Sequence, residues 1–238
     1  MASKQRKRRL IALSVVAVVP ICFLAQFFIT QYATSPAPTT EQAVAVVESD
    51  EPLALSELEK LPIRPADSKD GYARKEFGNG WSKWKDCDTR QRILGRDLTD
   101  IVYDDNGCKV LTGTLHDPYT GEIINFVRGN STSSLVQIDH VVALSNAWQT
   151  GAQHLDKTVR TQLANDDLEL LAVDGPANMQ KGAGDASVWL PPNKAFRCQY
   201  VARQIAVKIK YALWVVQAEY DAIKNVLQAC PTQQLPSP

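Results

Sequence analysis

The chain has 238 residues, of which 45% are hydrophobic and 22% are charged, so one or two folded domains are expected and global disorder and fibrous repeats are excluded. Its 26 basic and 26 acidic side chains cancel, and residues 61–238 hold 20 of each sign. A domain without net charge has no long-range field that attracts a polyanion. A nucleic-acid-binding function would therefore require the cations to gather on one face.

The N-terminus has the pattern of an export signal. Five basic residues within the first nine positions precede an apolar run from Leu10 to Ile29. Together with Ala33-Thr34-Ser35 this fits a secretory signal peptide, but about 20 apolar residues also suffice to cross a bilayer. We expect residues 1–33 to be a signal peptide or a membrane anchor, with the remainder extracellular or held on the outer face of the cytoplasmic membrane.

Residues 34–60 are rich in Pro, Thr, Ala, Val and Glu and contain no aromatic residue. This composition is typical of a disordered linker. We therefore expect the folded domain to span residues 61–238.

Strand signals follow in the first half of this domain. Ile101-Val102-Tyr103 and Val110-Leu111 flank Asn106-Gly107, a pair that favours a tight hairpin turn. A second turn, Asp117-Pro118-Tyr119-Thr120-Gly121, precedes a predicted strand at 122–127. Another short strand is predicted at 135–138, directly before Asp139-His140.

Helical signals dominate the second half. Ser145 is the predicted cap of a helical stretch that ends near Ala164 and is broken at Gly151. Residues 168–173 are apolar enough for a buried strand, which Gly175-Pro176 would end. A long helical stretch is predicted from Lys194 to Ala229.

Four cysteines lie beyond the apolar run: Cys87, Cys108, Cys198 and Cys230. An even number in an exported chain indicates disulfides, and the absence of a Cys-x-x-Cys pair argues against zinc. A straight helix from Cys198 to Cys230 would separate the two by about 48 Å, so pairing requires a helical hairpin that turns near 214–217. We predict the pairs Cys87–Cys108 and Cys198–Cys230, because each joins the ends of one local unit.

The sharpest motif is Gln137-Ile138-Asp139-His140-Val141-Val142-Ala143-Leu144, followed by Asn165-Asp166-Asp167-Leu168 and by Asn178-x-x-Lys181-Gly182. Together with Cys87-Asp88-Thr89-Arg90 and Trp189-Leu190-Pro191-Pro192-Asn193, it resembles the HNH endonuclease family, and more narrowly the secreted bacterial branch. The resemblance covers about residues 80–230.

The resemblance implies an α+β fold with a ββα-metal (HNH-type) nuclease core, an N-terminal β-hairpin region and a C-terminal helical hairpin. Asp139 and Asn178 would bind one divalent ion, Mg²⁺ or alternatively Mn²⁺, because both supply oxygen ligands. His140 would be the general base. Asp167, at the middle motif position, would brace the loop, and Lys181 would contact phosphate.

A basic stripe is the candidate face for the phosphate backbone. From Ala186 to Ala218 there is no acidic residue, and several cations lie on or just before the predicted helix. The candidate nucleic-acid-binding residues are Arg90, Arg128, Arg197, Arg203, Lys208 and Lys210, with Lys194 beside them.

We interpret the chain as an exported monomeric nuclease that hydrolyses phosphodiester bonds of DNA, with RNA as an alternative substrate. A second hypothesis is an exported or surface-anchored binding module with an HNH-like fold and no activity. A third is a toxin held by an immunity protein. The joint presence of Asp139, His140 and Asn178 favours catalysis, because a degenerate relative would be expected to lack one of them.

Overall fold

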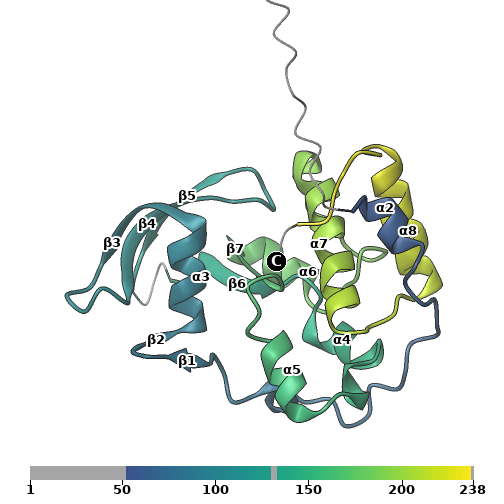
Figure 1. Ribbon diagram of the computed structural model, residues 1–238. Helices are drawn as coiled ribbons and strands as arrows, with labels where there is room; N and C mark the ends of the chain where they lie inside the picture. Colours follow the sequence, from purple (N-terminus) through teal and green to yellow (C-terminus); the bar gives the residue numbers. More distant parts are fainter. Residues whose placement is uncertain (1–51, 130–132, 237–238) are drawn as a thin grey trace, which may run out of the picture. The chain divides into compact units, whose positions relative to one another are not determined.

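The computed structural model describes residues 52–129 and 133–236 (Figure 1). These residues form small antiparallel sheets and helices, as the sequence predicts. The predicted signal or anchor segment, 1–33, and residues 34–51 of the predicted linker lie outside the described residues. Within the described ranges, no helix is both long and apolar enough to cross a membrane.

The predicted hairpin region is a three-stranded antiparallel sheet in the order β3-β4-β5. Its strands are β3 (Leu98–Tyr103), β4 (Val110–His116) and β5 (Ile123–Val127). The antiparallel pairing of β3 with β4 confirms the hairpin, and Gly107 adopts a φ of 67° in the loop between them. That loop spans residues 104–109 and is longer than the two-residue turn that Asn-Gly favours.

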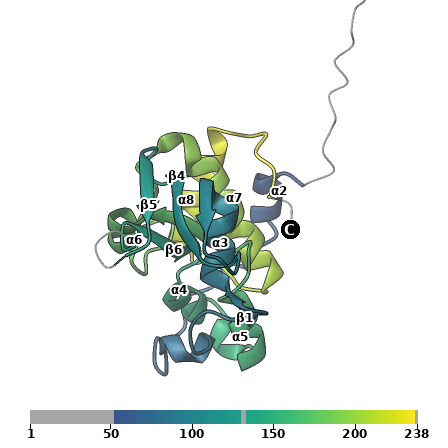
Figure 2. The ribbon, with the colours of Figure 1, turned by 90° about the vertical axis from the view of Figure 1, so that its left-hand side faces the viewer.

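Helix α3 (Thr89–Asp97) covers this sheet, as Figure 2 shows. It follows the short antiparallel pair β1 (Lys83–Trp84) and β2 (Cys87–Asp88). The helix begins at Thr89 because the Asp88 side chain accepts a hydrogen bond from the Gln91 amide, as an N-cap residue does. Ile93 and Leu94 are fully buried in the cluster that the helix forms with the sheet.

A second antiparallel pair, β6 (Val136–His140) and β7 (Leu170–Asp174), leads directly into helix α6 (Gly175–Lys181). The Asp174 carboxylate caps α6 by accepting from the Ala177 amide at 2.7 Å. A Cβ at position 175 would lie 2.2 Å from the Ser134 carbonyl oxygen, so only glycine permits this approach of helix and loop. Asp139 and His140 are the last two residues of β6, not the residues after it, because the strand extends beyond the predicted end.

The chain between β6 and β7 is helical, as predicted. It contains α4 (Leu144–Gln149), the 3₁₀ helix η2 (Ala152–His154) and α5 (Lys157–Leu163). The predicted capping role of Ser145 is wrong: Ala143 occupies the N-cap position, and the buried Ser145 hydroxyl has no partner among the described residues.

The predicted helical hairpin is confirmed as α7 (Arg197–Lys210) and α8 (Gln217–Gln228). Both predicted disulfides are present: Cys198–Cys230 joins the start of α7 to the end of α8, and Cys87–Cys108 ties β2 to the β3–β4 loop. Helix α2 (Ala54–Leu58) packs against α7 and α8. In Figure 1 these three helices lie on one side of the β6–β7 pair, and the β3-β4-β5 sheet lies on the other.

Helix α2 corrects the predicted linker boundary. Residues 52–60 belong to the folded part, because Ala54 and Leu58 are fully buried and the Ala54 amide donates to the Gln233 carbonyl. The two residues are four apart, which is the spacing of one helix face, and this pattern went unrecognised in the acidic, proline-flanked segment.

The β6–β7 pair separates two hydrophobic clusters. Ile138 and its partner Ala172 face the cluster under the three-stranded sheet, while Leu171 and Val173 face the helical cluster. Since successive strand residues point to opposite faces, Asp139 and His140 leave β6 on opposite sides.

Candidate functional site

The three residues of the predicted metal and base site line one pocket of about 360 Å³. Asp139 and His140 come from the end of β6, and Asn178 comes from α6. The strand pair and the helix that follows it therefore bring together residues that are 39 positions apart in the sequence.

Asp139 is nearly fully buried and has two fixed partners. The Tyr119 hydroxyl donates to Oδ2, and the Lys181 ammonium group lies 3.0 Å from Oδ1. Lys181 also donates to the backbone carbonyl of His140 at 2.7 Å. The carboxylate is thus held from both sides and keeps its orientation.

Tyr119 is a site residue that the sequence analysis missed. It lies in the Asp117–Gly121 turn, where the buried Asp117 carboxylate accepts from Thr120 and from the Asp174 amide. These bonds fix the turn against the start of α6 and direct Tyr119 toward Asp139. Burial, with the charge of Asp139, raises the pKa of Tyr119 well above its usual value, so its hydroxyl remains a donor. The sequence signal that could have identified Tyr119 is the turn string Asp-Pro-Tyr-Thr-Gly in which it lies.

His140 is buried as a neutral imidazole with one nitrogen fixed. Its Nε2 lies 3.0 Å from the Ala164 carbonyl oxygen; because a carbonyl can only accept, Nε2 carries the proton and Nδ1 keeps a free lone pair. The ring stacks on Trp81, with centroids 5.6 Å apart and planes 9° apart. Burial above all, and then the positive charge of Arg74, lower the pKa of His140 to about 3.

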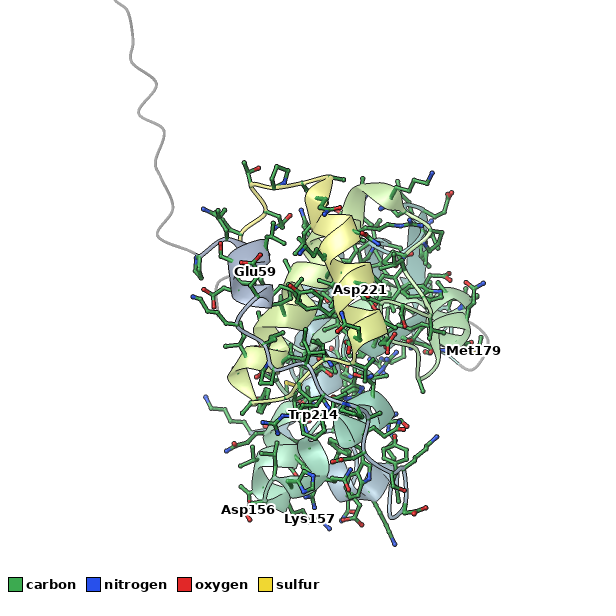
Figure 3. The ribbon with its side chains drawn as sticks, turned by 90° about the vertical axis from the view of Figure 1, so that its right-hand side faces the viewer. Glu59, Asp156, Lys157, Met179, Trp214 and Asp221 are labelled. Atoms are coloured by element: carbon green, nitrogen blue, oxygen red, sulfur yellow. A yellow bond between two sulfur atoms is a disulfide. The ribbon has the colours of Figure 1, made fainter. Side chains whose placement is uncertain are left out.

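Asn178 is half-buried on α6. Its Nδ2 donates to Gln137 Oε1 at 2.9 Å, which sets the rotamer of the amide, and Oδ1 has no hydrogen-bond partner among the described residues. The next residue, Met179, is 67% exposed and lies at the edge of the molecule (Figure 3). The pocket therefore lies beside an exposed helix.

The donor set fits a hard divalent cation. Within 52–129 and 133–236, no three His, Cys, Asp or Glu side chains gather as a metal cluster, so an ion here would have Asp139 and Asn178 as its protein ligands and water or phosphate for the rest. Each carboxylate oxygen of Asp139 has a second lone pair, and Asn178 Oδ1 is free. Oxygen donors with retained water suit Mg²⁺.

The two supporting residues make contacts that the motif alone did not specify. Asp167 is exposed and ties the loop to α3 through its pair with Arg92. Its neighbours also hold the loop: Asn165 accepts from Thr89, and Asp166 accepts from Tyr211. Lys181 has a fully buried side chain, so it does not reach a phosphate. Because Lys181 contacts both the Asp139 carboxylate and the His140 carbonyl at the end of β6, it positions these two groups.

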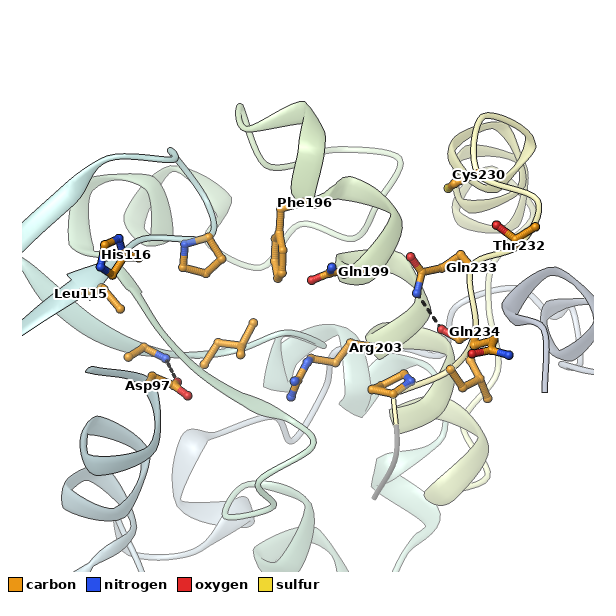
Figure 4. A pocket seen from close by; sticks show the side chains of 15 residues that line it. Asp97, Leu115, His116, Phe196, Gln199, Arg203, Cys230, Thr232, Gln233 and Gln234 are labelled. Carbon is orange, nitrogen blue, oxygen red and sulfur yellow. Dashed lines mark hydrogen bonds between the residues drawn. The ribbon is translucent and has the colours of Figure 1, made fainter. Parts of the chain in front are cut away.

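The predicted basic stripe is not an exposed face. Lys208 is fully buried and forms an ion pair with Glu219 at 2.9 Å, because its side of α7 packs against α8. Arg203 donates to the Leu168 carbonyl and lines a pocket of about 710 Å³ (Figure 4), whose lining includes neither Asp139 nor His140.

Apart from Lys194, which is exposed, the remaining predicted cations are also engaged within the fold. Arg90 and Arg128 donate to backbone carbonyls of the neighbouring strands and loops, Arg197 donates to the Pro191 carbonyl, and exposed Lys210 pairs with Asp166. Because of these contacts, cations that lie close together in the sequence do not form one exposed binding surface.

Unpredicted cations line the site instead. Lys69 and Arg74 border the pocket of Asp139 and Asn178, and both are exposed. Arg74 has no ion pair or hydrogen bond among the described residues. Since Lys181 compensates Asp139, the rim of the pocket carries excess positive charge that suits a phosphate group.

Comparison with known proteins places the chain in a family. Residues 88–226 match the family model of the C-terminal domain of GmrSD restriction endonucleases. An uncharacterised secreted protein of Arthroderma benhamiae (strain ATCC MYA-4681 / CBS 112371) is 36% identical over 179 residues, which are 74% of the chain and 84% of that protein. No solved structure matches the chain significantly.

The chain therefore belongs to the family of the GmrSD restriction endonuclease C-terminal domain, an HNH-related nuclease family. Nothing in the comparisons supports the narrower assignment to a secreted bacterial branch.

Proposed function

We propose that the chain is an exported, metal-dependent nuclease of the HNH type that hydrolyses phosphodiester bonds of DNA, with RNA as an alternative substrate. The observation that carries the proposal is the state of His140: a neutral, oriented imidazole with Nδ1 free, in the same pocket as a carboxylate and an amide oxygen. The secreted relative supports export.

His140 is suited to accept a proton from water. The Ala164 carbonyl holds the Nε2 proton, so the basic lone pair is on Nδ1. Burial lowers the pKa of His140 below its usual value, so the imidazole is neutral near pH 7. A water placed beside Nδ1 would lose its proton to the imidazole as it attacks phosphorus, which is general-base catalysis.

Asp139 and Asn178 would hold the ion, which supplies charge stabilisation at the phosphate and the leaving oxygen when it is bound. Tyr119 and Lys181 keep the Asp139 carboxylate in place. Arg74 and Lys69, at the rim, would bind the non-bridging phosphate oxygens.

The direct experiment is to incubate the full chain, solubilised in mild detergent because residues 10–29 are apolar, with plasmid DNA, single-stranded DNA and RNA. Mg²⁺, Mn²⁺ or EDTA is present in parallel reactions. We expect cleavage that EDTA abolishes. Absence of cleavage of every substrate with either ion would replace the proposal by the binding-module hypothesis.

A further inference from the structure

A second pocket lies on the other side of His140. Its volume is about 350 Å³, within the range of small-molecule sites, about 300–1,000 Å³. The chain from Arg74 to Trp81 forms one wall, and His140, Leu144 and Ala164 form the other. Arg74, His140 and Leu144 also line the pocket of Asp139 and Asn178, so the two pockets meet at the candidate base.

The wall formed by residues 74–81 is fixed before any ligand binds. The 3₁₀ helix η1 (Arg74–Phe77) is held by its buried Phe77 and by Arg160, which donates to the Glu76 carbonyl at 2.9 Å. At the other end, the Ser82 amide donates to Asn165 Oδ1 at 2.8 Å. Between these anchors, Gly78 and Gly80 adopt φ values of 108° and 93°, which L-residues rarely adopt.

The chemistry of the walls changes from one pocket to the other. The first pocket has a carboxylate, an amide and cations. The second has exposed Arg74 and Lys75 at its edge but no carboxylate, and it adds the rings of Trp81 and Phe77 and the exposed amide of Asn79. A nucleotide has the same order of groups, since a charged phosphate is followed by a flat ring with hydrogen-bonding edges.

We propose that this second pocket, which no comparison assigns, binds the nucleobase next to the scissile phosphate, with Arg74 on the phosphate at the junction and Asn79 on the edge of the base. The inference rests on the proposed function and adds a substrate preference to it. A base inside a half-enclosed pocket has left its stack and its pairing partner, which costs least in a single strand. The site therefore selects single-stranded or unpaired nucleic acid.

Binding measured in EDTA, where no cleavage is expected, tests the pocket independently of catalysis. The full chain in mild detergent is titrated with three probes of equal length: a short single-stranded DNA, its duplex, and an abasic strand with the same phosphates. We expect the single strand to bind about tenfold more tightly than the other two, the usual scale of one bound base. Equal affinity for the single strand and the abasic strand would overturn the proposal, as would tighter binding of the duplex.

Variants separate the two halves of the pocket. Arg74→Ala should weaken the binding of all three probes. The slope of log affinity against log salt concentration should become shallower by about one, the contribution of one phosphate contact. Asn79→Ala should weaken the binding of the intact single strand and leave the binding of the other two probes unchanged. Arg64→Ala is the matched control, because Arg64 lies over the Trp214 ring, 5.5 Å from its centroid, and lines neither pocket. An Asn79→Ala variant with unchanged affinity for all probes would place the base elsewhere.

Two outcomes separate the base pocket from the nuclease activity. Single-strand preference without cleavage in Mg²⁺ or Mn²⁺ would remove the nuclease and keep the pocket. Cleavage of duplex and single strand at equal rates, with equal affinities in EDTA, would keep the nuclease and remove the pocket.

Discussion

The ammonium group of Lys181 lies 3.0 Å from Oδ1 of Asp139, and both side chains are buried. The same ammonium group donates to the backbone carbonyl of His140. One cation on α6 thus compensates the candidate metal ligand and fixes the backbone of the candidate base. The ion pair connects the stability of the fold directly to the geometry of the site.

Lys181→Met should lower the free energy of unfolding by about 3–5 kcal/mol, because it leaves the Asp139 carboxylate buried without its cation. The double variant Lys181→Met/Asp139→Asn should recover part of this loss, since no unpaired charge remains. Urea denaturation measures both. Lys60→Met is the control: Lys60 is 68% exposed in its pair with Glu57, and such a pair contributes about 0–1 kcal/mol. Wild-type stability of Lys181→Met would contradict the assigned role.

Tyr119→Phe should keep the ring packing against Trp189 and Tyr200 and remove only the hydrogen bond to Asp139. We expect a loss of about 1–3 kcal/mol of stability, the scale of a bond to a charged acceptor. A higher metal concentration should also be needed for half-maximal cleavage, because Asp139 loses one fixed partner. Tyr220→Phe, on α8, should change neither quantity. An unaltered metal requirement in Tyr119→Phe would show that the hydroxyl does not position Asp139.

Several elements followed from local sequence signals. Asn106-Gly107 located the β3–β4 hairpin, and the distance limit of a disulfide required the turn between α7 and α8. These predictions succeeded because turn chemistry and chain geometry act over a few residues. The grouping of Asp139, His140 and Asn178 was expected from a motif, and the β6–β7 pairing is its physical cause.

Burial of the lysines was not foreseen. Lysine is rarely buried unless it is paired, so Lys208 was expected on the surface, although it shares the helix face of the buried residues Val201 and Ile205. Its partner Glu219 lies on the next helix, and a pairing between helices depends on tertiary packing. Arg74 was missed for a related reason: its segment has no motif, and the packing of Phe77 brings it to the site.

The apo protein should lose stability in acid because of His140. Its folded-state pKa is about 3, below its ordinary value of 6.5, so between these values the unfolded chain binds a proton that the folded chain does not. Stability is therefore fully present above about pH 6.5 and falls as the pH decreases toward 3, by up to about 1.4 kcal/mol per pH unit.

Urea denaturation in EDTA at several pH values tests this. His140→Gln, which does not titrate, should show a smaller slope in the same window. Parallel profiles for wild type and variant would mean that His140 is protonated in the folded state at its ordinary pKa.

Replacing both Cys198 and Cys230 by Ser should destabilise the fold by about 3–4 kcal/mol, because the bond closes a loop of 32 residues in the unfolded chain. Hydrogen exchange should rise at Ala54 and Leu235, since the chain after Cys230 pairs with residues 52–54. Replacing Cys87 and Cys108 is the matched comparison, with a similar loss of stability and no effect at those amides. Unchanged exchange at Ala54 in the first variant would show that the disulfide does not hold the C-terminal segment.

The most direct test of the central claim measures metal binding and cleavage on the same His140 variants. His140→Ala and His140→Gln keep Asp139 and Asn178, so Mn²⁺ should bind by calorimetry as in wild type, while cleavage should fall by about 10²–10⁴ and extra metal should not restore it. Asp139→Ala should lose Mn²⁺ binding in the same experiment. Circular dichroism establishes that each variant is folded. Undiminished cleavage by both His140 variants would contradict the account.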